Sequence, residues 1–508
     1  MITVGFIVLA VITAIAYLRR NDEVFSRNLM ISAAMGAALG GFVGWLNSGV
    51  VVALEGLPVG ALAVSLLFVL TSPFLGKKSG HEHVRGTRLL DAHQLRAATR
   101  KSAKTTSQKR WVEIGRVAVP PDVEPVHFLM AGSPGSGKSV AINQIIFQAR
   151  QRGDRMIIAD PGGEAMARFW KEGDAILNPL DRRSVRWSPF AEIRDVWDTS
   201  TLAKSIIPDG SGSSSEWNLY SQQVVSAILK RQVAAGQTTN ADFLQHIAIA
   251  SMQELAELVQ GTPAARLLNP EVKGMAGSVL GVLGAYAAVY ADALDHAAGA
   301  ADFSIRKWVE DESQAGVLWI PYQINHRAML APLVGAWLDI AVSSVLSLRP
   351  SRERNIWLVA DELPLLSKIN SLVEAATNGR RYSLRLVCGL QAVSQLQKTY
   401  GTHDATTILS SLRSWLILNQ SDAETAEAMS KGIGEQEVIR VQTSSSKNSA
   451  GSSESATRQW ATQKAVLPSE LLNLPKLEGF LRLAEHGVAR VKLRPMGYPE
   501  VTQPFIKK

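Results

Sequence analysis

Apolar runs of two lengths divide the chain into two parts. Before residue 77, apolar runs at 2–18, 29–46 and 57–75 approach the length of a membrane-spanning helix, since about twenty apolar residues cross a bilayer. After residue 110, the apolar runs are short and alternate with stretches of helical period. We therefore predict a transmembrane region at 1–76 with two or three helices, followed by a folded domain of alternating strands and helices.

The short apolar runs predict a mainly parallel sheet covered by helices, which is the α/β fold class. Eight residues after the first of these runs, Val140–Arg152 has the period of a helix. In such sheets, ligands bind at the carboxyl ends of the strands, where Asp160, Asp361 and Gln391 would lie. The runs of strand length are 126–131, 155–160, 175–177, 316–320, 355–360, 384–390 and 415–418.

Long helical patterns interrupt this alternation. They predict an all-α domain at 191–302, inserted into an α/β domain that is made of 111–190 and 303–508. Further along, the serine-rich stretch 443–457 is either a mobile loop or a hairpin tip, and 479–493 is predicted to be a hairpin. The helical patterns of the insertion are 219–235, 241–258 and 275–298.

Basic residues are concentrated directly after the apolar N-terminal region. The chain has 53 basic and 45 acidic residues, a net charge of +8, and the segment 77–110 alone has ten basic residues against two acidic ones. This segment predicts a basic juxtamembrane stretch attracted to anionic lipid headgroups, with DNA contact as the alternative. Basic residues mark the cytoplasmic side of a membrane protein, so we expect 77–508 to be cytoplasmic.

The chain has one cysteine, Cys388. A single cysteine excludes internal disulfides and thiolate zinc sites, and it fits a reducing compartment. We expect Cys388 to be a small buried side chain of the core. The spacing of the nine histidines predicts no structural metal.

A complete GxxxxGKS motif, Gly132–Ser139, lies between the first short apolar run and the helical stretch that follows. Its glycines let successive backbone N–H groups face a polyphosphate, and the positive end of the next helix points at the same anion. Lys138 would reach the β and γ phosphates of ATP, and Ser139 would bind Mg²⁺ through its hydroxyl. The predicted ATP-binding residues are Gly132, Gly135, Ser136, Gly137, Lys138, Ser139 and Val140.

Two carboxylates follow the apolar run 355–360, as ATP hydrolysis requires. Asp361 would hold Mg²⁺ through water, and Glu362 would act as the general base for the attacking water. The alternative is that both acids simply end an exposed strand. Gln391, which follows the run 384–390, either senses the γ phosphate and orients water or is a polar residue that starts a helix.

These motifs and their order resemble the type IV coupling proteins of conjugative plasmids and type IV secretion systems, in the compact TraD/TrwB-like branch. The resemblance implies a RecA-like P-loop ATPase domain with an inserted all-α domain, anchored in the bacterial inner membrane as a multi-pass protein and assembled as a homo-hexamer. Such proteins look like ATP-driven DNA pumps that receive relaxase-bound DNA and pass it to inner-membrane components of the secretion channel. The segments that carry the resemblance are 1–76, 114–120, 131–140, 158–164, 303–308, 358–363, 389–391 and 467–470.

The same resemblance implies a role for one arginine of the segment 378–381. Arg380 falls where the family places a candidate arginine finger, which reaches the nucleotide of a neighbouring subunit. Arg381 and Arg385 are rivals for this role. The remaining alternative is that all three are surface charges.

Two other functions compete with a conjugative DNA motor. A chromosomal DNA translocase of the FtsK type would carry a C-terminal winged-helix reader, and we expect no room for one after Leu493. The chain could also be chiefly a substrate receptor in which ATP is a structural ligand. Intact Lys138, Asp361 and Glu362 argue against that reading.

Overall fold

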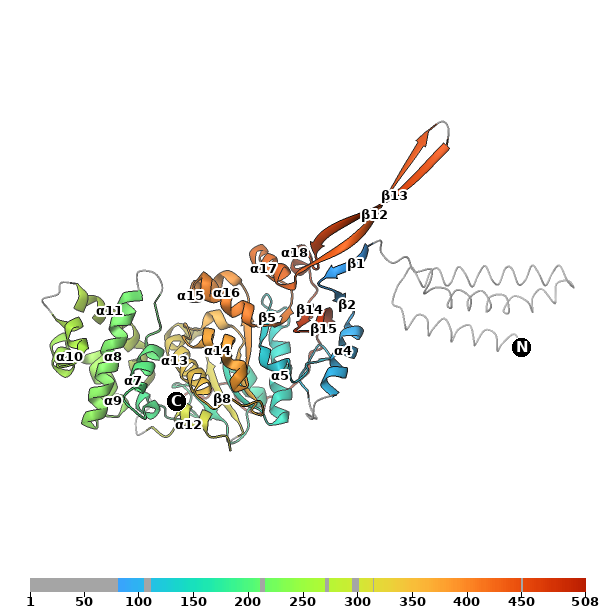
Figure 1. Cartoon of the computed structure of the whole chain (residues 1–508). Helices are drawn as coiled ribbons and strands as arrows, with labels where there is room; N and C mark the ends of the chain where they lie inside the picture. The colour runs from blue at the N-terminus through green and yellow to red at the C-terminus, as the bar shows by residue number, and fades with distance from the viewer. Residues whose placement is uncertain are drawn as a thin grey trace. The chain divides into compact units, whose positions relative to one another are not determined.

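The computed structural model describes residues 81–104, 111–210, 215–269, 274–294, 301–313, 315–448 and 451–508 (Figure 1). The transmembrane helices predicted in 1–76 lie outside these residues. The chain divides into two units, one made of 1–82 and 438–461 and the other of 83–437 and 462–508. The larger unit contains the α/β sheet and the helices of the predicted insertion.

Among the described residues, a ten-stranded sheet forms the centre of the larger unit, in the order β2-β15-β14-β11-β5-β10-β9-β6-β8-β7. From β11 to β7 each strand is parallel to its neighbours, whereas β14 is antiparallel to β11 and β15. Each apolar run of strand length forms a strand, so the expectation of a mainly parallel sheet is confirmed. The strands are β2 (Leu89–Leu90), β5 (Phe128–Ala131), β6 (Arg155–Pro161), β7 (Ala175–Ile176), β8 (Val317–Tyr322), β9 (Ile356–Ala360), β10 (Leu384–Leu390), β11 (Ser414–Ile417), β14 (Glu478–Leu483) and β15 (Gly487–Lys492).

Strand β10 lies between β5 and β9 and aligns the ends of all three strands. Leu390 pairs with Ala131 of β5, and Cys388 pairs with Ala360 of β9. Every residue of these three strands is buried, because helices cover both faces of a parallel sheet. Cys388 is a buried core residue, as predicted. The residues that follow Ala131, Ala360 and Leu390 therefore meet at one edge of the sheet.

Alternate residues of a strand face two hydrophobic layers. In β5, Leu129 belongs to the same core cluster as Leu338 of α13 (Arg327–Leu346), and Met130 belongs to the cluster of Ile145 in α5 (Lys138–Arg152). Successive side chains of a strand point to opposite faces, so these clusters mark the two sides of the sheet. The other helices around the sheet are α6 (Glu164–Phe169), α12 (Ile305–Glu310), α14 (Leu372–Asn378), α15 (Val393–Tyr400), α16 (Thr402–Ser411), α17 (Ala423–Ile433) and α18 (Pro468–Leu472).

One helical stretch among the described residues, Ile324–Leu346, is long and apolar enough to cross a membrane. Of its most apolar window, 72% is buried inside the structure. A helix that is apolar on all sides also occurs in the core of a large domain. This stretch includes α13, which is such a core helix.

The region between β7 and β8 is helical, and Figure 1 shows its helices gathered at one end of the larger unit. The prediction of one helix over 241–258 is wrong in one respect, because the helix is interrupted at Ala250. There Ser251 starts a new helix through a capping box, since its hydroxyl accepts from the N–H of Glu254 (3.3 Å) and the Glu254 carboxylate accepts from the N–H of Ser251 (2.6 Å). The helices are α7 (Asp198–Ile206), α8 (Ser215–Ala235), α9 (Asn240–Leu244), the π-helix η4 (Gln245–Ile249), α10 (Met252–Leu258) and α11 (Met275–Leu294).

The two ends of this helical region meet. Trp187 and Phe303 form a β-bridge, and the N–H of Arg186 donates to Asp302 (2.9 Å). The predicted boundaries of the insertion, 191 and 302, lie next to this junction and stay predictions.

Both hairpins expected near the C-terminal end are present. Strands β14 and β15 form the hairpin predicted at 479–493. Strands β12 (Glu435–Asn448) and β13 (Gly451–Lys464) include the serine-rich stretch, so of the two alternatives the structure has the hairpin.

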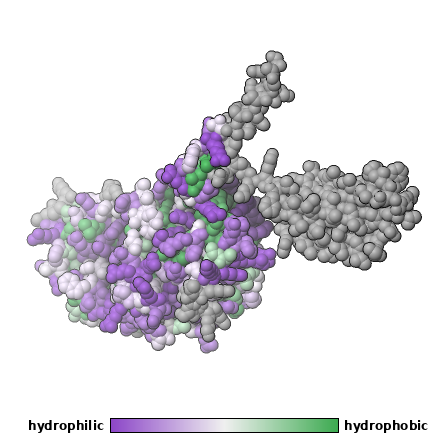
Figure 2. Space-filling view, turned by 45° about the vertical axis from the view of Figure 1, so that its right-hand side comes forward, coloured by the Kyte–Doolittle hydropathy of each residue, from purple (hydrophilic) through white to green (hydrophobic). Residues whose placement is uncertain are grey.

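Part of the basic segment 77–110 belongs to the larger unit. Strand β2 pairs with β15, and α4 (Ala92–Lys104) buries Leu95 completely. On the face that Figure 2 shows, the described surface is mainly hydrophilic with small separate hydrophobic areas.

Candidate nucleotide-binding site

The GxxxxGKS segment forms a tight loop between β5 and α5. Gly137 has φ 118°, a conformation that favours glycine. A Cβ on Gly132 would lie 2.5 Å from Ser136 Oγ, so a larger residue at 132 would force this loop open. Helix α5 begins at Lys138, and its first N–H groups therefore face the loop.

A residue of the neighbouring strand end holds this loop in place. The N–H of Ser133 donates to the carbonyl of Asn419 (2.8 Å), and the Ser133 hydroxyl bonds to Asn419 Oδ1 (3.1 Å). Asn419 in turn donates to the carbonyls of Leu472 and Leu474. Sequence reasoning missed Asn419. It follows the predicted strand 415–418, and the rule that parallel strands end at one edge could have found it.

Lys138 and Glu362 form a buried ion pair at the strand ends. Their side chains are 9% and 6% exposed. Gln391 Nε2 donates a hydrogen bond of 2.7 Å to Glu362 Oε2, the oxygen that also contacts Lys138. Lys138 and Gln391, which the sequence places at the nucleotide site, therefore contact the same oxygen atom of Glu362.

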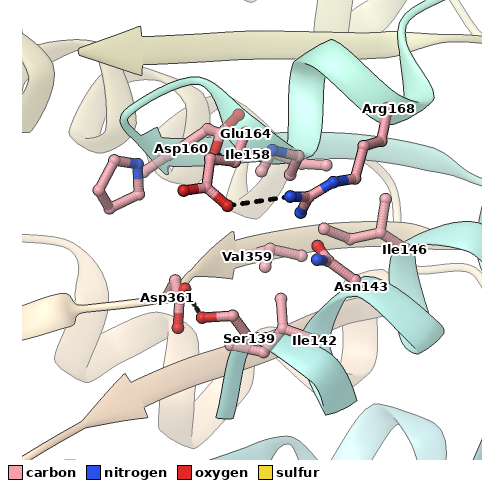
Figure 3. Close-up of a pocket in the computed structure, with 13 residues that line it drawn as sticks. Ser139, Ile142, Asn143, Ile146, Ile158, Asp160, Glu164, Arg168, Val359 and Asp361 are labelled. Atoms are coloured by element: carbon pink, nitrogen blue, oxygen red, sulfur yellow. Dashed lines mark hydrogen bonds and ion pairs between the residues drawn. The ribbon is translucent and has the colours of Figure 1, made fainter. Parts of the chain in front are cut away.

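Ser139 and Asp361, the chain neighbours of this ion pair, face each other, as Figure 3 shows. Ser139 Oγ donates to Asp361 Oδ2 over 2.7 Å. Among the described residues, the other oxygens of the two carboxylates, Asp361 Oδ1 and Glu362 Oε1, are buried without a hydrogen-bond partner. Buried polar atoms normally have partners, and hydroxyl and carboxylate oxygens are the ligands that Mg²⁺ prefers. Ser139 and Asp361 could thus hold a divalent cation with its water ligands.

A cavity of about 120 Å³ adjoins Ser139 and Asp361, between α5 and the β6–α6 loop (Figure 3). Asp160 at the end of β6 lines it, and its carboxylate accepts a hydrogen bond of 2.7 Å from the N–H of Met166. Burial raises the pKa of Asp160 to about 7, and the negative charges of Asp361 and Glu164 act in the same direction. Asp160 lies where the sequence placed it, at a strand end beside Asp361.

Arg380 lies at the amino end of β10, whereas the phosphate-binding loop lies at the carboxyl ends of the strands. It belongs to the turn η8 (Gly379–Tyr382) that precedes β10, and the length of β10 is about 20 Å. Arg380 and Arg381 are both exposed. The rival Arg385 is only 3% exposed, donates to Glu124 (3.0 Å), and cannot reach another subunit.

The structure therefore brings all but one of the predicted site residues together. Gly132 and Val140 bracket the loop and the first turn of α5, and Asp361, Glu362 and Gln391 lie at the adjoining strand ends. Arg380 is the exception. The roles assigned to these residues stay predictions.

Comparisons with known proteins agree on one family. The family described as "Type IV secretion-system coupling protein DNA-binding domain" matches residues 111–494. Coupling protein TraD of Escherichia coli (strain K12) is 27% identical over 445 residues, which covers 85% of this chain and 61% of the length of TraD.

Two solved structures are similar over nearly their whole length. Bacterial conjugative coupling protein TrwBdeltaN70 is 33% identical with a TM-score of 0.76, covering 85% of this chain and 98% of that one. Plasmid coupling protein TrwB in complex with ADP and Mg²⁺ is 32% identical with a TM-score of 0.74, covering 84% and 97%.

Proposed function

Because the chain belongs to the family of type IV secretion-system coupling proteins, we propose that it is an ATP-hydrolysing motor that moves DNA during conjugation. The observation that carries this proposal is the cluster of Lys138, Glu362 and Gln391 at the mouth of the phosphate-binding loop. A protein that only bound nucleotide would not need a buried general base at this position. We further propose that it works as an inner-membrane homo-hexamer that couples relaxase-bound DNA to the secretion channel.

ATP is the substrate that the loop fits. The N–H groups of Gly135 to Ser139 would bind its phosphates at the positive end of α5. The similarity to TrwB, which was solved with ADP and Mg²⁺, supports an adenine nucleotide together with this ion. Mg²⁺, when bound by Ser139 and Asp361, would neutralise charge on the phosphate oxygens.

Glu362 would accept a proton from the attacking water. Without nucleotide its carboxylate is paired with Lys138. When ATP binds, Lys138 would turn to the β and γ phosphates, which frees Glu362 to act as a base. The water oxygen then bonds to the γ phosphorus, the bond to the β-phosphate oxygen breaks, and ADP leaves. Gln391 would keep Glu362 oriented through its hydrogen bond.

Arg380 would complete the site of a neighbouring subunit. Its position at the far edge of the sheet, about 20 Å away along β10, means that it cannot reach the nucleotide of its own subunit. In a ring of identical subunits, an exposed arginine on one face can contact the phosphates bound at the next interface, where it would stabilise the charge of the transition state.

Three further observations support the cellular role. The family is described by DNA binding, the relative TraD is named a coupling protein, and the apolar runs before residue 77 match membrane spans in length. DNA in the ring would be held through its phosphates, so binding would weaken steeply with salt.

Turnover of ATP by the full chain in detergent tests this proposal. We expect hydrolysis that rises with single- or double-stranded DNA and with protein concentration, and that is lost in Lys138→Thr and Glu362→Gln. If the wild-type protein binds ATP but hydrolyses none under any DNA condition, the motor is wrong and a substrate receptor takes its place.

A further inference from the structure

The strand that leads into the phosphate-binding loop begins at a strained, buried residue. His127 directly precedes β5, is 2% exposed and has φ 65° and ψ 157°. Residues other than glycine rarely adopt this backbone conformation, and it persists only where the surrounding structure holds it. Its carbonyl accepts a hydrogen bond of 3.1 Å from the N–H of Ser414 in β11. His127 is therefore fixed in the sheet by its backbone.

The imidazole of His127 joins two elements that flank Arg380. Its Nδ1 accepts a hydrogen bond of 3.1 Å from the N–H of Leu386 in β10. On its other side the ring faces the backbone of Ala375 and Ala376 in α14, which favours the protonated ring. Because Nδ1 is an acceptor, the ring proton is assigned to Nε2. Burial lowers the pKa of His127 to about 3, so the ring stays neutral and keeps this pattern.

The turn that carries Arg380 is built directly on this contact. The N–H of Gly379 donates to the carbonyl of Ala375, one of the two α14 residues that the His127 ring faces. A Cβ on Gly379 would lie 3.6 Å from His127 Cε1, so the ring packs beside the start of η8. On the other side of η8, Arg385 donates to the carbonyl of Ser383 over 2.9 Å.

Only strand β5 separates His127 from the phosphate-binding loop in the sequence. Strand β5 runs from Phe128 to Ala131, and the loop starts at Gly132. His127 thus contacts, at one point, the strand that ends in the nucleotide site of its own subunit and the turn that would serve the neighbouring site.

We propose that His127 is a positioning residue that fixes the turn carrying Arg380 to the base of β5. Through this contact, a shift of the phosphate-binding loop in one subunit is passed to the arginine that completes the next site. The inference rests on the proposed function, because it needs Arg380 to act in trans.

Two substitutions separate the hydrogen bond of the ring to β10 from its contact with α14 and η8. His127→Asn keeps an acceptor near Nδ1 and loses the reach to α14, whereas His127→Gln extends to the position of Nε2. We expect His127→Asn to lower the kcat of DNA-stimulated ATP hydrolysis on the order of a hundredfold, the effect of a misplacement of about 1 Å. The KM for ATP stays the same, and His127→Gln regains part of the lost rate. A purely structural role would instead lower the melting temperature and leave the rate of the folded protein unchanged.

Mixed oligomers decide on which site His127 acts. Inactive Lys138→Thr and Arg380→Ala subunits, when mixed, should recover activity at interfaces that have one intact loop and one intact arginine. His127→Asn should recover activity with Lys138→Thr and not with Arg380→Ala. The reverse pattern would show that His127 serves its own phosphate-binding loop and would overturn the inference. If His127→Asn does not fold, His127→Gln takes its place in the mixtures.

The failure of this inference differs from the failure of the motor. If Arg380→Ala alone hydrolyses ATP at the wild-type rate while Lys138→Thr is inactive, the inference is wrong and the ATPase stands. If the wild-type chain hydrolyses no ATP, both are wrong.

Discussion

Gly389 in β10 lies against the backbone of Asp361, so closely that a Cβ on Gly389 would stand 1.6 Å from the Asp361 carbonyl oxygen. No real Cβ comes that near a backbone atom, so any larger residue at 389 must displace the end of β9. Asp361 and Glu362 directly follow β9. The positions of the proposed Mg²⁺ ligand Asp361 and the proposed general base Glu362 therefore depend on the absence of a side chain at Gly389.

Gly389→Ala should nearly abolish ATP hydrolysis. We expect kcat to fall on the order of a hundredfold, because groups that act on the reacting water tolerate shifts of about 1 Å poorly. The free energy of unfolding should fall by about 1–3 kcal/mol from overpacking. Turnover assays and thermal melts measure both effects. Gly284→Ala in α11 is the control, since a Cβ there meets nothing within 4 Å, and a Gly389→Ala protein with wild-type turnover would contradict the prediction.

Glu362→Gln should separate binding from hydrolysis. Lys138 must leave Glu362 before it can contact the phosphates of ATP, and a neutral glutamine holds it less strongly. We expect ATP to bind at least as tightly as to the wild type, while turnover falls by about 10²–10⁴, the usual contribution of a general base.

Calorimetric titration with ATP and a phosphate-release assay measure the two quantities. Glu216→Gln, at an exposed position of α8, makes the same chemical change away from the site. Weaker ATP binding in Glu362→Gln would mean that the carboxylate holds the nucleotide and not the attacking water.

Much of this site could be predicted from the sequence, because its residues lie in short local motifs. The loop, Lys138 and Ser139 are contiguous, and Asp361 with Glu362 follows a run of apolar residues, so each half can be found without knowing the fold. Their meeting at one edge follows from the parallel sheet alone. Arg380 comes just before β10, so the direction of that strand is enough to place it at the end opposite the nucleotide site. Its proposed role came from a family resemblance.

Contacts between distant segments could not be predicted. His127 touches α14 and β10 through a ring whose neighbours are about 250 residues away in sequence, and no local pattern marks such a contact. The break at Ala250 is different, because Ser251 and Glu254 form the S-x-x-E signature of a helix start. The prediction of one helix over 241–258 used the helical period only and did not take this helix start into account.

Gln391→Ala should slow hydrolysis without weakening ATP binding. The side chain donates to Glu362 Oε2, and a hydrogen bond to a charged group contributes about 1.5–3 kcal/mol. If that energy is expressed in the transition state, kcat falls by about tenfold to a hundredfold. Steady-state kinetics check this against Gln395→Ala, an exposed position of α15. An unchanged kcat would assign Gln391 to the start of the helix only.

Asp160 should make the nucleotide-free protein less stable as the pH rises. Burial raises its pKa in the folded state to about 7 from an ordinary value of 3.8. Between these two values the folded protein binds a proton that the unfolded chain has lost, so the free energy of unfolding falls as the pH increases through this window. Asp160→Asn cannot ionise and should lose this part of the pH dependence.

Melting temperatures of the nucleotide-free, metal-free protein between pH 5 and 8 test this prediction. We expect the difference between Asp160→Asn and the wild type to move in favour of the variant as the pH rises, and to level off above the folded-state pKa. Asp122→Asn, at an exposed position, should show a constant difference. A difference for Asp160→Asn that does not change with pH would mean that the carboxyl at the end of β6 is ionised throughout, held by the N–H groups of Ala165 and Met166.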